Sequence, residues 1–297
     1  MAKPLNILIT GGAGFLGWAL SKNLDSLGYD VKLLLRPTSN RSRLKSGGWD
    51  NKICTYESDA DILNIIQEIT PDIIIHTACQ YENTGNQIVA IADSNIRFGL
   101  LILQSSLQLN KPICFVNIGT SLPVDLNLYA LSKHQFAAWG KNLAANQKNQ
   151  LKFVNINLQN MYGPDDDPTR FAGWIIDCCL NNKPVIDLTE GCQKRDFIYI
   201  DDVVSGIATV VKNLDQLQKQ DEIDLGSGQI ITIRYFTEMV YTLTKAASKI
   251  RFGVLPYRQN EKMVIAADIS KLTSFGWRPK TSLQKGLETI IENYRLK

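Results

Sequence analysis

A tyrosine and a lysine lie four residues apart in the stretch YALSK, at Tyr129 and Lys133. On a helix this spacing places both side chains on one face. A phenol has an ordinary pKa of about 10, which is too high for ready proton exchange at neutral pH. Because a neighbouring ammonium favours the phenolate, the pair predicts a tyrosine of lowered pKa that serves as a general acid or base.

A hydroxyl group suited to the same chemistry precedes this pair, in the stretch NIGTS. A hydroxyl there would lie beside Tyr129 and hydrogen-bond a substrate oxygen. Thr120 and Ser121 are both candidates, and turn formation is the alternative role for each of them. We favour Thr120 as the catalytic hydroxyl.

Three glycines in the stretch TGGAGFLG, at Gly11, Gly14 and Gly17, follow the apolar run LNILI. Each glycine costs roughly 0.5–1 kcal/mol relative to alanine inside an ordered element, so a cluster needs a reason. Between a strand and a helix, it lets a pyrophosphate approach main-chain N–H groups at the positive end of the helix dipole. A tight turn that only packs helix on strand is the alternative. The pattern G-x-x-G-x-x-G at this place favours dinucleotide binding.

The end of the next apolar run, residues 29–36, bears on which dinucleotide is bound. NAD enzymes hold the ribose 2′-hydroxyl with an acidic residue at this point. Here the run ends in Arg36, and Arg41 and Arg43 follow. Guanidinium groups suit a 2′-phosphate better than a free hydroxyl. We therefore predict NADP, with NAD as the alternative cofactor and a solvated basic loop as the alternative role for the arginines.

The elements that must position these residues follow from an alternation of strand-like and helix-period segments. The predicted strands cover residues 5–10, 29–36, 52–56, 71–78, 111–119 and 151–158, and the helices between them cover 14–27, 58–69, 89–108 and 127–146. Continuous β-branched runs are typical of parallel strands covered on both faces by helices. We predict an α/β fold, a Rossmann-type doubly wound parallel sheet, as the NAD(P)-binding domain of residues 1–160.

The regular alternation of strand-like and helix-period segments ends after residue 160. Helical segments near 171–182, 201–213, 234–248 and 282–294 flank short strands at 183–188 and 195–200. We predict a smaller C-terminal lobe over residues 161–297 that binds the substrate, with some of its segments returning to the Rossmann sheet. The ligand is expected outside the carboxyl ends of the parallel strands.

Composition excludes several function classes. The 297 residues carry a net charge of +3 without a basic stripe, which argues against nucleic acid as a partner. Six cysteines without a CxxC motif indicate a reducing compartment, and two histidines argue against a His-rich metal site. No apolar stretch reaches the roughly 18 residues of a membrane span, and the first strand begins too early for a signal peptide. We expect a cytoplasmic protein with no metal and no membrane contact.

Taken together, these residues resemble the extended short-chain dehydrogenase/reductase superfamily, in its NAD(P)-dependent nucleotide-sugar epimerase/dehydratase branch. The resemblance covers nearly the whole chain and includes TGGAGFLG, IIIHTA, Asn95 in DSNIRFGLLIL, YALSK, NMYGP and KRDFIYIDDVV. The stretches HTACQYE, LQNMYGPDDDPTRF, IIDCCLNNKP and GCQKRDFIYIDDVVSG most resemble 4-ketoreductases of the CDP-abequose synthase type. The chain departs from the branch in its short loop between Thr120 and Tyr129 and in GTS, which replaces a serine-rich motif.

The resemblance implies a role for each site residue. Tyr129 would be the catalytic acid, Lys133 its partner and a ribose ligand, and Thr120 the hydroxyl that orients the carbonyl. The other cofactor-binding residues would be Gly11, Gly14, Phe15, Leu16 and Gly17 at the pyrophosphate, Arg36, Asp59 at the adenine amino group, and Asn95, which supports the active-site helix. The substrate-binding residues would be Gln80, Tyr81, Thr120, Asn160, Arg195 and Arg258, the two arginines gripping a diphosphate. For these arginines, solvated surface charge is the alternative.

These assignments imply NADPH-dependent reduction of the 4-keto group of a CDP- or dTDP-linked deoxyhexose, in the supply of surface polysaccharide such as lipopolysaccharide. One alternative is an epimerase or dehydratase that retains its NAD, although GTSLPV lacks the acidic pair expected of a dehydratase. A second alternative is a non-catalytic dinucleotide-binding scaffold, against which the intact Tyr129–Lys133 pair argues. By analogy with the fold, we expect a homodimer formed through the two long helices that flank the fourth and fifth strands.

Overall fold

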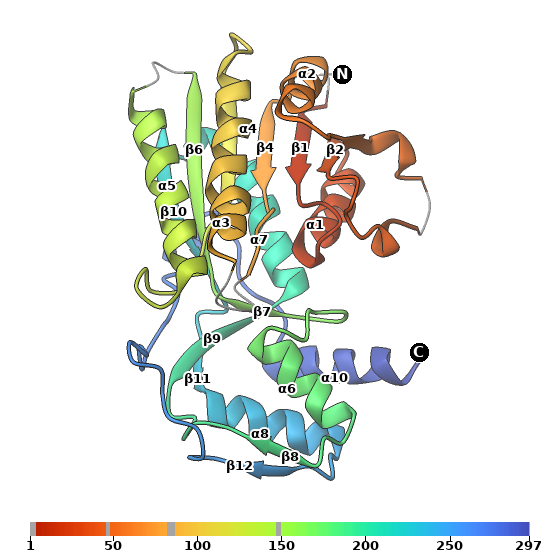
Figure 1. Cartoon of the computed structure of the whole chain (residues 1–297), viewed down its shortest axis with the longest axis vertical. Helices are drawn as coiled ribbons and strands as arrows, with labels where there is room; N and C mark the ends of the chain where they lie inside the picture. Colours follow the sequence, from red (N-terminus) through yellow and green to blue (C-terminus); the bar gives the residue numbers. More distant parts are fainter. Residues whose placement is uncertain (1–3, 46–47, 82–86, 147–149, 297) are drawn as a thin grey trace. The chain divides into compact units, whose positions relative to one another are not determined.

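The computed structural model describes residues 4–45, 48–81, 87–146 and 150–296 (Figure 1). The chain divides into two compact units. Unit 1 comprises Met1–Thr120, Asn127–Asn157 and Ile207–Ile223, and unit 2 comprises Ser121–Leu126, Leu158–Gly206 and Asp224–Lys297. Each unit is therefore assembled from segments that alternate along the chain.

Unit 1 is built on a seven-stranded sheet with the strand order β10-β6-β5-β4-β1-β2-β3 (Figure 1). The strands are β1 (Asn6–Thr10), β2 (Asp30–Leu35), β3 (Ile53–Thr55), β4 (Ile73–His76), β5 (Ile113–Ile118), β6 (Leu151–Leu158) and β10 (Gln220–Leu225). The chain moves outward from β1 to β3 and then crosses to β4 on the other side of β1. Every pair of neighbouring strands from β6 through β5, β4, β1 and β2 to β3 is parallel, which confirms the predicted doubly wound sheet. The strand order reverses beside β1, where such sheets bind ligands.

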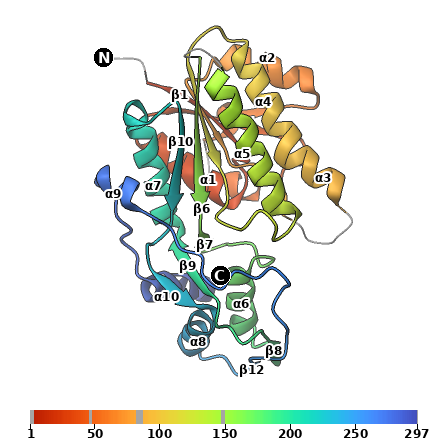
Figure 2. The same cartoon turned by 90° about the vertical axis from the view of Figure 1, so that its left-hand side faces the viewer.

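Helices cover both faces of this sheet (Figure 2). They are α1 (Phe15–Ser26), α2 (Asp59–Ile69), α3 (Ile88–Ala92), the π-helical segment Asp93–Arg97, α4 (Phe98–Leu107), α5 (Leu128–Asn146) and α7 (Ile200–Lys212), with short 3-10 turns at Ser42–Lys45, Asp50–Lys52 and Leu214–Gln216. Helix α2 begins with a capping box, in which Ser58 and Asp61 exchange hydrogen bonds with each other's backbone. Ser58 is therefore the N-cap, and Asp59 is the first helical residue.

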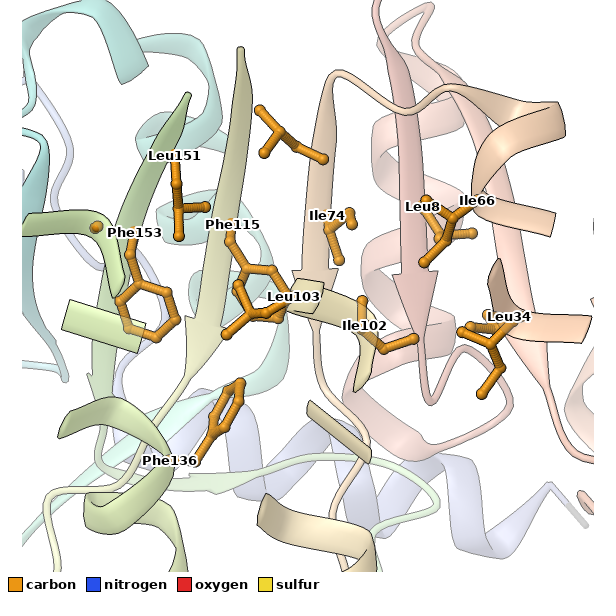
Figure 3. Packing of buried hydrophobic residues seen from close by; sticks show 13 residues of the cluster. Leu8, Leu34, Ile66, Ile74, Ile102, Leu103, Phe115, Phe136, Leu151 and Phe153 are labelled. Atoms are coloured by element: carbon orange, nitrogen blue, oxygen red, sulfur yellow. The ribbon is translucent and has the colours of Figure 1, made fainter. Parts of the chain in front are cut away.

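The main core lies between the sheet and helices α2, α4 and α5 (Figure 3). Alternate residues of the strands point into it, and Ile66, Ile102, Leu103 and Phe136 meet them from the helices. Burial of such a side chain stabilises the fold by roughly 1.5–3 kcal/mol. The core thus fixes the register of the strands whose ends carry the candidate site.

The apolar helical run from Ile88 to Leu107 corrects one sequence-based prediction. By length and composition it could cross a membrane, whereas the sequence analysis found no such stretch. The run spans α3, the π-helical segment and α4, and polar residues interrupt its apolar sequence. Ile102 and Leu103, which belong to this run, are fully buried in the hydrophobic core. We therefore interpret it as a core helix of unit 1.

Unit 2 contains two small sheets and four helices of its own. The sheets are β11-β9-β7 (Ile230–Thr232, Lys194–Tyr199, Asn160–Tyr162) and β12-β8 (Lys249–Arg251, Val185–Asp187), and the helices are α6 (Phe171–Leu180), α8 (Ile233–Thr244), α9 (Ser270–Ser274) and α10 (Leu283–Arg295). An aromatic cluster forms its centre, where the rings of Phe197 and Phe236 stack with centroids 4.1 Å apart. This cluster anchors β9, the strand that carries Arg195.

Candidate active site

The glycine turn between β1 and α1 has no space for larger residues. Gly11 has a φ of +72°, and a Cβ there would lie 2.7 Å from the backbone nitrogen of Ala78. A Cβ at Gly17 would lie 2.3 Å from the carbonyl oxygen of Gly11. Helix α1 begins at the N-cap Gly14 without a side-chain cap. The turn therefore presents backbone at a helix N-terminus, which suits a bound phosphate.

Tyr129 and Lys133 both lie on α5, as the sequence predicts, and both are buried. Lys133 is only 2% exposed, and burial lowers the pKa of its ammonium group. The ring of Tyr129 stacks on Tyr81, with centroids 4.6 Å apart and the planes inclined by 26°. Tyr81 therefore contacts the candidate acid directly.

Asn95 connects α5 to the segment that follows β4. Its Oδ1 accepts from the backbone N–H of Gln80 at 2.7 Å, and its Nδ2 donates to the carbonyl oxygen of Gln80 at 2.9 Å. The same Nδ2 donates to Ser132 Oγ at 2.9 Å, and Ser132 Oγ donates to the carbonyl oxygen of Tyr129. Because Asn95 is fully buried, its contacts support a positioning role more than a ligand contact.

The two candidate hydroxyls have different surroundings. Ser121 Oγ donates to Gln159 Oε1 at 3.1 Å, and the backbone N–H of Ser121 donates to Leu158 O. Thr120 ends the first segment of unit 1, the unit that also carries Tyr129. Ser121 is thus held by Gln159 within unit 2, whereas Thr120 belongs to unit 1.

The far end of the predicted cofactor site lies around the end of β2. The side chain of Arg36 is exposed and lies close enough to Tyr56 to oppose the rise in phenol pKa that burial causes. The backbone of Arg36 forms a turn with Ser39 through two hydrogen bonds. Asp59 forms an exposed ion pair with Arg97. Basic and aromatic groups thus meet where the sequence predicts the adenosine end of a dinucleotide.

Unit 2 contains both predicted substrate arginines. Arg195 is buried and forms an ion pair with Glu261, a residue that the sequence analysis did not single out. Burial lowers the pKa of Arg195, Glu261 opposes that shift, and Arg258 adds to it. The backbone N–H of Glu261 donates to Arg258 O at 3.2 Å, so one turn brings both residues toward Arg195. Glu261 lies 66 residues from Arg195, so no local sequence pattern could have identified it as the partner.

Two acidic residues of the RDFIYIDD stretch, Asp196 and Asp202, accept hydrogen bonds from backbone N–H groups. Asp196 is fully buried and accepts from the N–H groups of Ser227 and Gly228 at 2.7 and 2.9 Å. Asp202 accepts from the N–H groups of Lys280 and Thr281, both at 2.9 Å. Asn160 Nδ2 donates to the carbonyl oxygen of Asp196 at 3.2 Å. These contacts organise unit 2 around Arg195.

A comparison with protein families decides the classification. Residues 7–226 match the model of the NAD dependent epimerase/dehydratase family. The chain belongs to this family. The predicted relationship is thereby confirmed, and the protein is an enzyme of the NAD(P)-dependent oxidoreductase type.

Relatives within the family match almost end to end. CDP-abequose synthase of Salmonella typhimurium is 28% identical, over 96% of this chain and 97% of that protein. UDP-glucuronate 4-epimerase of Thermodesulfobacterium geofontis is 27% identical, over 96% and 94%. The crystal structure of UDP-glucuronic acid 4-epimerase from Bacillus cereus with UDP-glucuronic acid and NAD superposes with a TM-score of 0.84 at 23% identity, covering 98% of this chain and 99% of that one. This structural likeness confirms the fold.

The residues of the site fit the dinucleotide that the family name implies. The cradle at Gly11 and Gly17 is one that a Cβ would fill, and the uncapped start of α1 offers N–H groups to a pyrophosphate. Lys133 is a buried cation on the helix that also carries Tyr129. A ribose hydroxyl at that position would accept a hydrogen bond from it. Both features belong to unit 1.

Proposed function

We propose that the enzyme reduces the 4-keto group of a nucleoside-diphosphate deoxyhexose, CDP- or dTDP-linked, with NADPH. The observation that carries this proposal is the buried Tyr129–Lys133 pair on α5, in the unit that also contains the glycine turn. The resemblance to CDP-abequose synthase over nearly the whole length of both chains supports the sugar-nucleotide substrate. The product would enter the supply of surface polysaccharide.

Each residue has a defined part in this reaction. Tyr129 donates the proton to the C4 oxygen as the carbonyl is reduced, and Lys133 stabilises the phenolate that remains. Thr120 donates a hydrogen bond to the same oxygen and orients the carbonyl. NADPH, when bound, supplies the hydride. Tyr81 and Gln80 would line the sugar, since Tyr81 stacks on Tyr129 and Asn95 fixes the backbone of Gln80.

The side chains at the end of β2 support NADP over NAD. The strand ends at Leu35 and is followed by Arg36, where enzymes that bind NAD carry an acidic residue. The exposed guanidinium of Arg36 can pair with a 2′-phosphate. A dissociable NADPH also suits net reduction, because each turnover consumes one reduced cofactor.

Arg195 and Arg258 would hold the two phosphates of the nucleotide. Arg258 lies near enough to Arg195 to contribute to the lowering of its pKa, which supports a shared subsite within unit 2. Two cations this close, of which one is buried, suit a dianionic ligand that guanidinium groups pair bidentately. Asn160, on neighbouring β7, would border the same subsite.

An epimerase that retains its cofactor is the second candidate, and the 4-epimerases among the relatives favour it. A turnover experiment separates the two. The purified protein is incubated with NADPH and CDP- or dTDP-linked 4-keto-6-deoxyhexoses, and NADPH absorbance is followed. A reductase consumes one NADPH per sugar, whereas an epimerase copurifies with NAD and shows no net consumption. Dinucleotide binding without turnover of any sugar would favour the scaffold alternative.

Tyr129→Phe tests the proton donor. We expect kcat to fall by about 10²–10⁴, the usual contribution of general acid catalysis, while the Kd for NADPH changes only a few-fold. Lys133→Ala should lose activity and also weaken NADPH binding, because Lys133 would hold the ribose. Turnover near the wild-type rate in Tyr129→Phe would refute the assignment.

A titration with free nucleotides tests the diphosphate subsite. CDP, dTDP, UDP and GDP are titrated into the NADP-bound protein, and we expect at least one to bind at micromolar Kd. Arg195→Ala and Arg258→Ala should each cost about 1.5–3 kcal/mol of binding, the range for hydrogen bonds to charged groups. Arg251→Ala, which removes an arginine paired with Asp187 in the same unit, is the matched control. Binding of none of the four nucleotides would leave only a general short-chain reductase.

We also infer a soluble, cytoplasmic homodimer. Ile88 and Val89 on α3 and Trp139 on α5 are 61%, 72% and 56% exposed, and the two helices contact each other. Large apolar side chains gathered on a surface are typical of protein interfaces. A second copy of the chain would bury them, and sedimentation of Trp139→Glu beside the wild type tests this.

A further inference from the structure

A row of buried polar side chains crosses the sheet of unit 1. The register pairs Thr10 with His76, His76 with Asn117, and Asn117 with Asn155. Register partners on neighbouring parallel strands point to the same face, and all four residues are buried. Each lies two residues beyond a core residue labelled in Figure 3, namely Leu8, Ile74, Phe115 and Phe153. The row therefore lies between the hydrophobic core and the carboxyl ends of the strands.

Hydrogen bonds connect the members at both ends of this row. Thr10 Oγ1 lies 2.8 Å from His76 Nδ1, and it accepts from the backbone N–H of Ala78 at 3.4 Å. Asn117 Nδ2 donates to Asn155 Oδ1 at 2.7 Å, and Asn155 Nδ2 donates to Asn157 Oδ1 at 2.8 Å. The side-chain amides of Asn117 and Asn155 thus donate in the same direction along the row, toward Asn157.

The tautomer of His76 is an assignment, because a hydroxyl oxygen can accept two hydrogen bonds and donate one. We assign the tautomer in which Thr10 Oγ1 donates to Nδ1 and the proton is on Nε2. Within the described part of the chain, His76 Nε2 and Asn117 Oδ1 are buried and have no partner. In this tautomer one is a donor and the other an acceptor, on register-paired residues. They are chemically complementary, but no hydrogen bond joins them, so the row of hydrogen bonds is interrupted between β4 and β5.

Both ends of the row meet the candidate site. Thr10 immediately precedes Gly11, and its carbonyl oxygen accepts from Thr77 Oγ1 at 2.7 Å. That same Oγ1 would lie 2.8 Å from a Cβ at Gly11 or at Gly17, so it borders the glycine turn. At the other end, Asn155 Oδ1 would lie 2.7 Å from a Cβ at Gly119, the residue before Thr120.

The surroundings of His76 keep its ring uncharged. Burial lowers the pKa of His76 to about 3, and the ammonium of Lys133 on α5 contributes in the same direction. The aromatic rings of Phe98, Phe115 and Phe136 have centroids 5.2 to 5.8 Å from the imidazole. A charged imidazole would repel Lys133 and could no longer accept from Thr10. Neutral His76 is thus compatible with a cationic Lys133.

We propose that His76 is a positioning residue, which as a neutral imidazole protonated on Nε2 couples the glycine turn to the Thr120 loop, on one side through its hydrogen bond with Thr10 and on the other through its place beside Asn117, which donates to Asn155. This inference rests on the proposed function, since it assigns the two ends of the row to the cofactor and to the reacting carbonyl. It adds a residue that touches neither ligand.

Nitrogen NMR of the protein without ligands tests the protonation state directly. The chain has only two histidines, so His134→Gln assigns both imidazole signals. We expect the His76 ring to remain neutral from pH 5 to 8, with a proton on Nε2 and a signal that shifts in Asn117→Ala. A proton on Nδ1, or a ring that gains charge in this range, would overturn the proposal. Because no cofactor is needed, this result stands even if the wild type binds neither NADPH nor NADH and the proposed function fails.

Two substitutions separate the ends of the row. The side-chain amide of an asparagine at position 76 places a polar atom near the position of Nδ1, and that of a glutamine places one near the position of Nε2. We expect His76→Asn to keep the Kd for NADPH within about threefold while kcat falls about tenfold, because the smaller side chain leaves a space beside Asn117. His76→Gln should preserve kcat better and weaken NADPH binding about tenfold. A purely structural role predicts equal losses in kcat and affinity in both variants, and that result would refute the coupling.

Discussion

At the scale of single residues, three cations of the candidate site are held in three different surroundings. Lys133 is buried and has a lowered pKa, Arg195 is buried but paired with Glu261, and Arg36 is exposed. The surroundings match the proposed ligands: a neutral ribose hydroxyl, a diphosphate that must compete with a carboxylate, and a phosphate at the protein surface. In the proposed function, these three positive charges would serve different purposes because they differ in burial and in pairing.

Arg36 should determine the cofactor preference. In Arg36→Asp the 2′-phosphate of NADPH loses a charge-assisted contact and meets a carboxylate, which should cost about 1.5–3 kcal/mol. NADH binding should improve, because the new carboxylate can accept from a ribose hydroxyl. Fluorescence titration of both cofactors against wild type and variant measures this. Equal affinities for NADPH and NADH in the wild type would already contradict the hypothesis.

The residue types of the site could largely be predicted from sequence, whereas their partners could not. The four-residue spacing of Tyr129 and Lys133 predicts a shared helix face, and α5 provides it. The ion pair of Arg195 with Glu261 joins positions 66 residues apart, and no local pattern indicates such a contact. The hydrogen bond of Ser121 with Gln159 likewise joins positions 38 residues apart.

At the scale of elements, the longer strands and helices follow from their sequence patterns. The continuous apolar runs of β1, β4 and β5 are buried on both faces, as predicted for parallel strands under helices. The short strands β7 and β12 and the five-residue helix α9 were not predicted. Three residues are too few to show a period, and tertiary pairing forms these strands. The contacts of the RDFIYIDD stretch could not be predicted either, because Asp196 and Asp202 accept hydrogen bonds from backbone N–H groups far away in the sequence.

The connection from β1 to α1 should be the element most sensitive to added volume. In Gly17→Ala the new methyl group would meet the Gly11 carbonyl oxygen at 2.3 Å, and backbone cannot yield as a side chain does. We expect a loss of about 1–3 kcal/mol in the free energy of unfolding and at least about tenfold weaker NADPH binding. Gly14→Ala, where the nearest contact is 3.1 Å, should have a milder effect on both. Chemical denaturation and cofactor titration of the two variants provide the comparison.

At the scale of the whole molecule, the two units share the chain in alternating segments. Residues 121–126 leave unit 1 for unit 2, and residues 207–223 return from unit 2 to unit 1. The sequence analysis placed a division at residue 160 and expected some segments to return to the sheet. Periodicity could not identify which segments return, because β10 resembles any other short strand until its pairing with β6 is known.

Residues 1–160 alone should not form a native domain. This fragment lacks the end of α7 and β10, so the edge of β6 and part of one sheet face would be uncovered. We expect an aggregating or loosely packed product without a cooperative thermal transition, because an open edge strand pairs with other chains. Circular dichroism and size-exclusion chromatography beside the full-length protein check this. A soluble fragment that unfolds cooperatively and binds NADPH would contradict the prediction.

The position of β10 in the chain has a consequence during synthesis on the ribosome. The first six strands of the sheet can pair as soon as β6 has emerged, but β10 is translated only after β7, β8 and β9. One edge of strand β9 also stays unpaired until its partner β11, which follows β10 in the chain, has been translated. Through this interval the nascent chain carries exposed strand edges in two unfinished units at once, a state prone to misassembly. Slow translation between residues 160 and 232 would prolong it, so the yield of active enzyme should depend on how quickly that stretch is made.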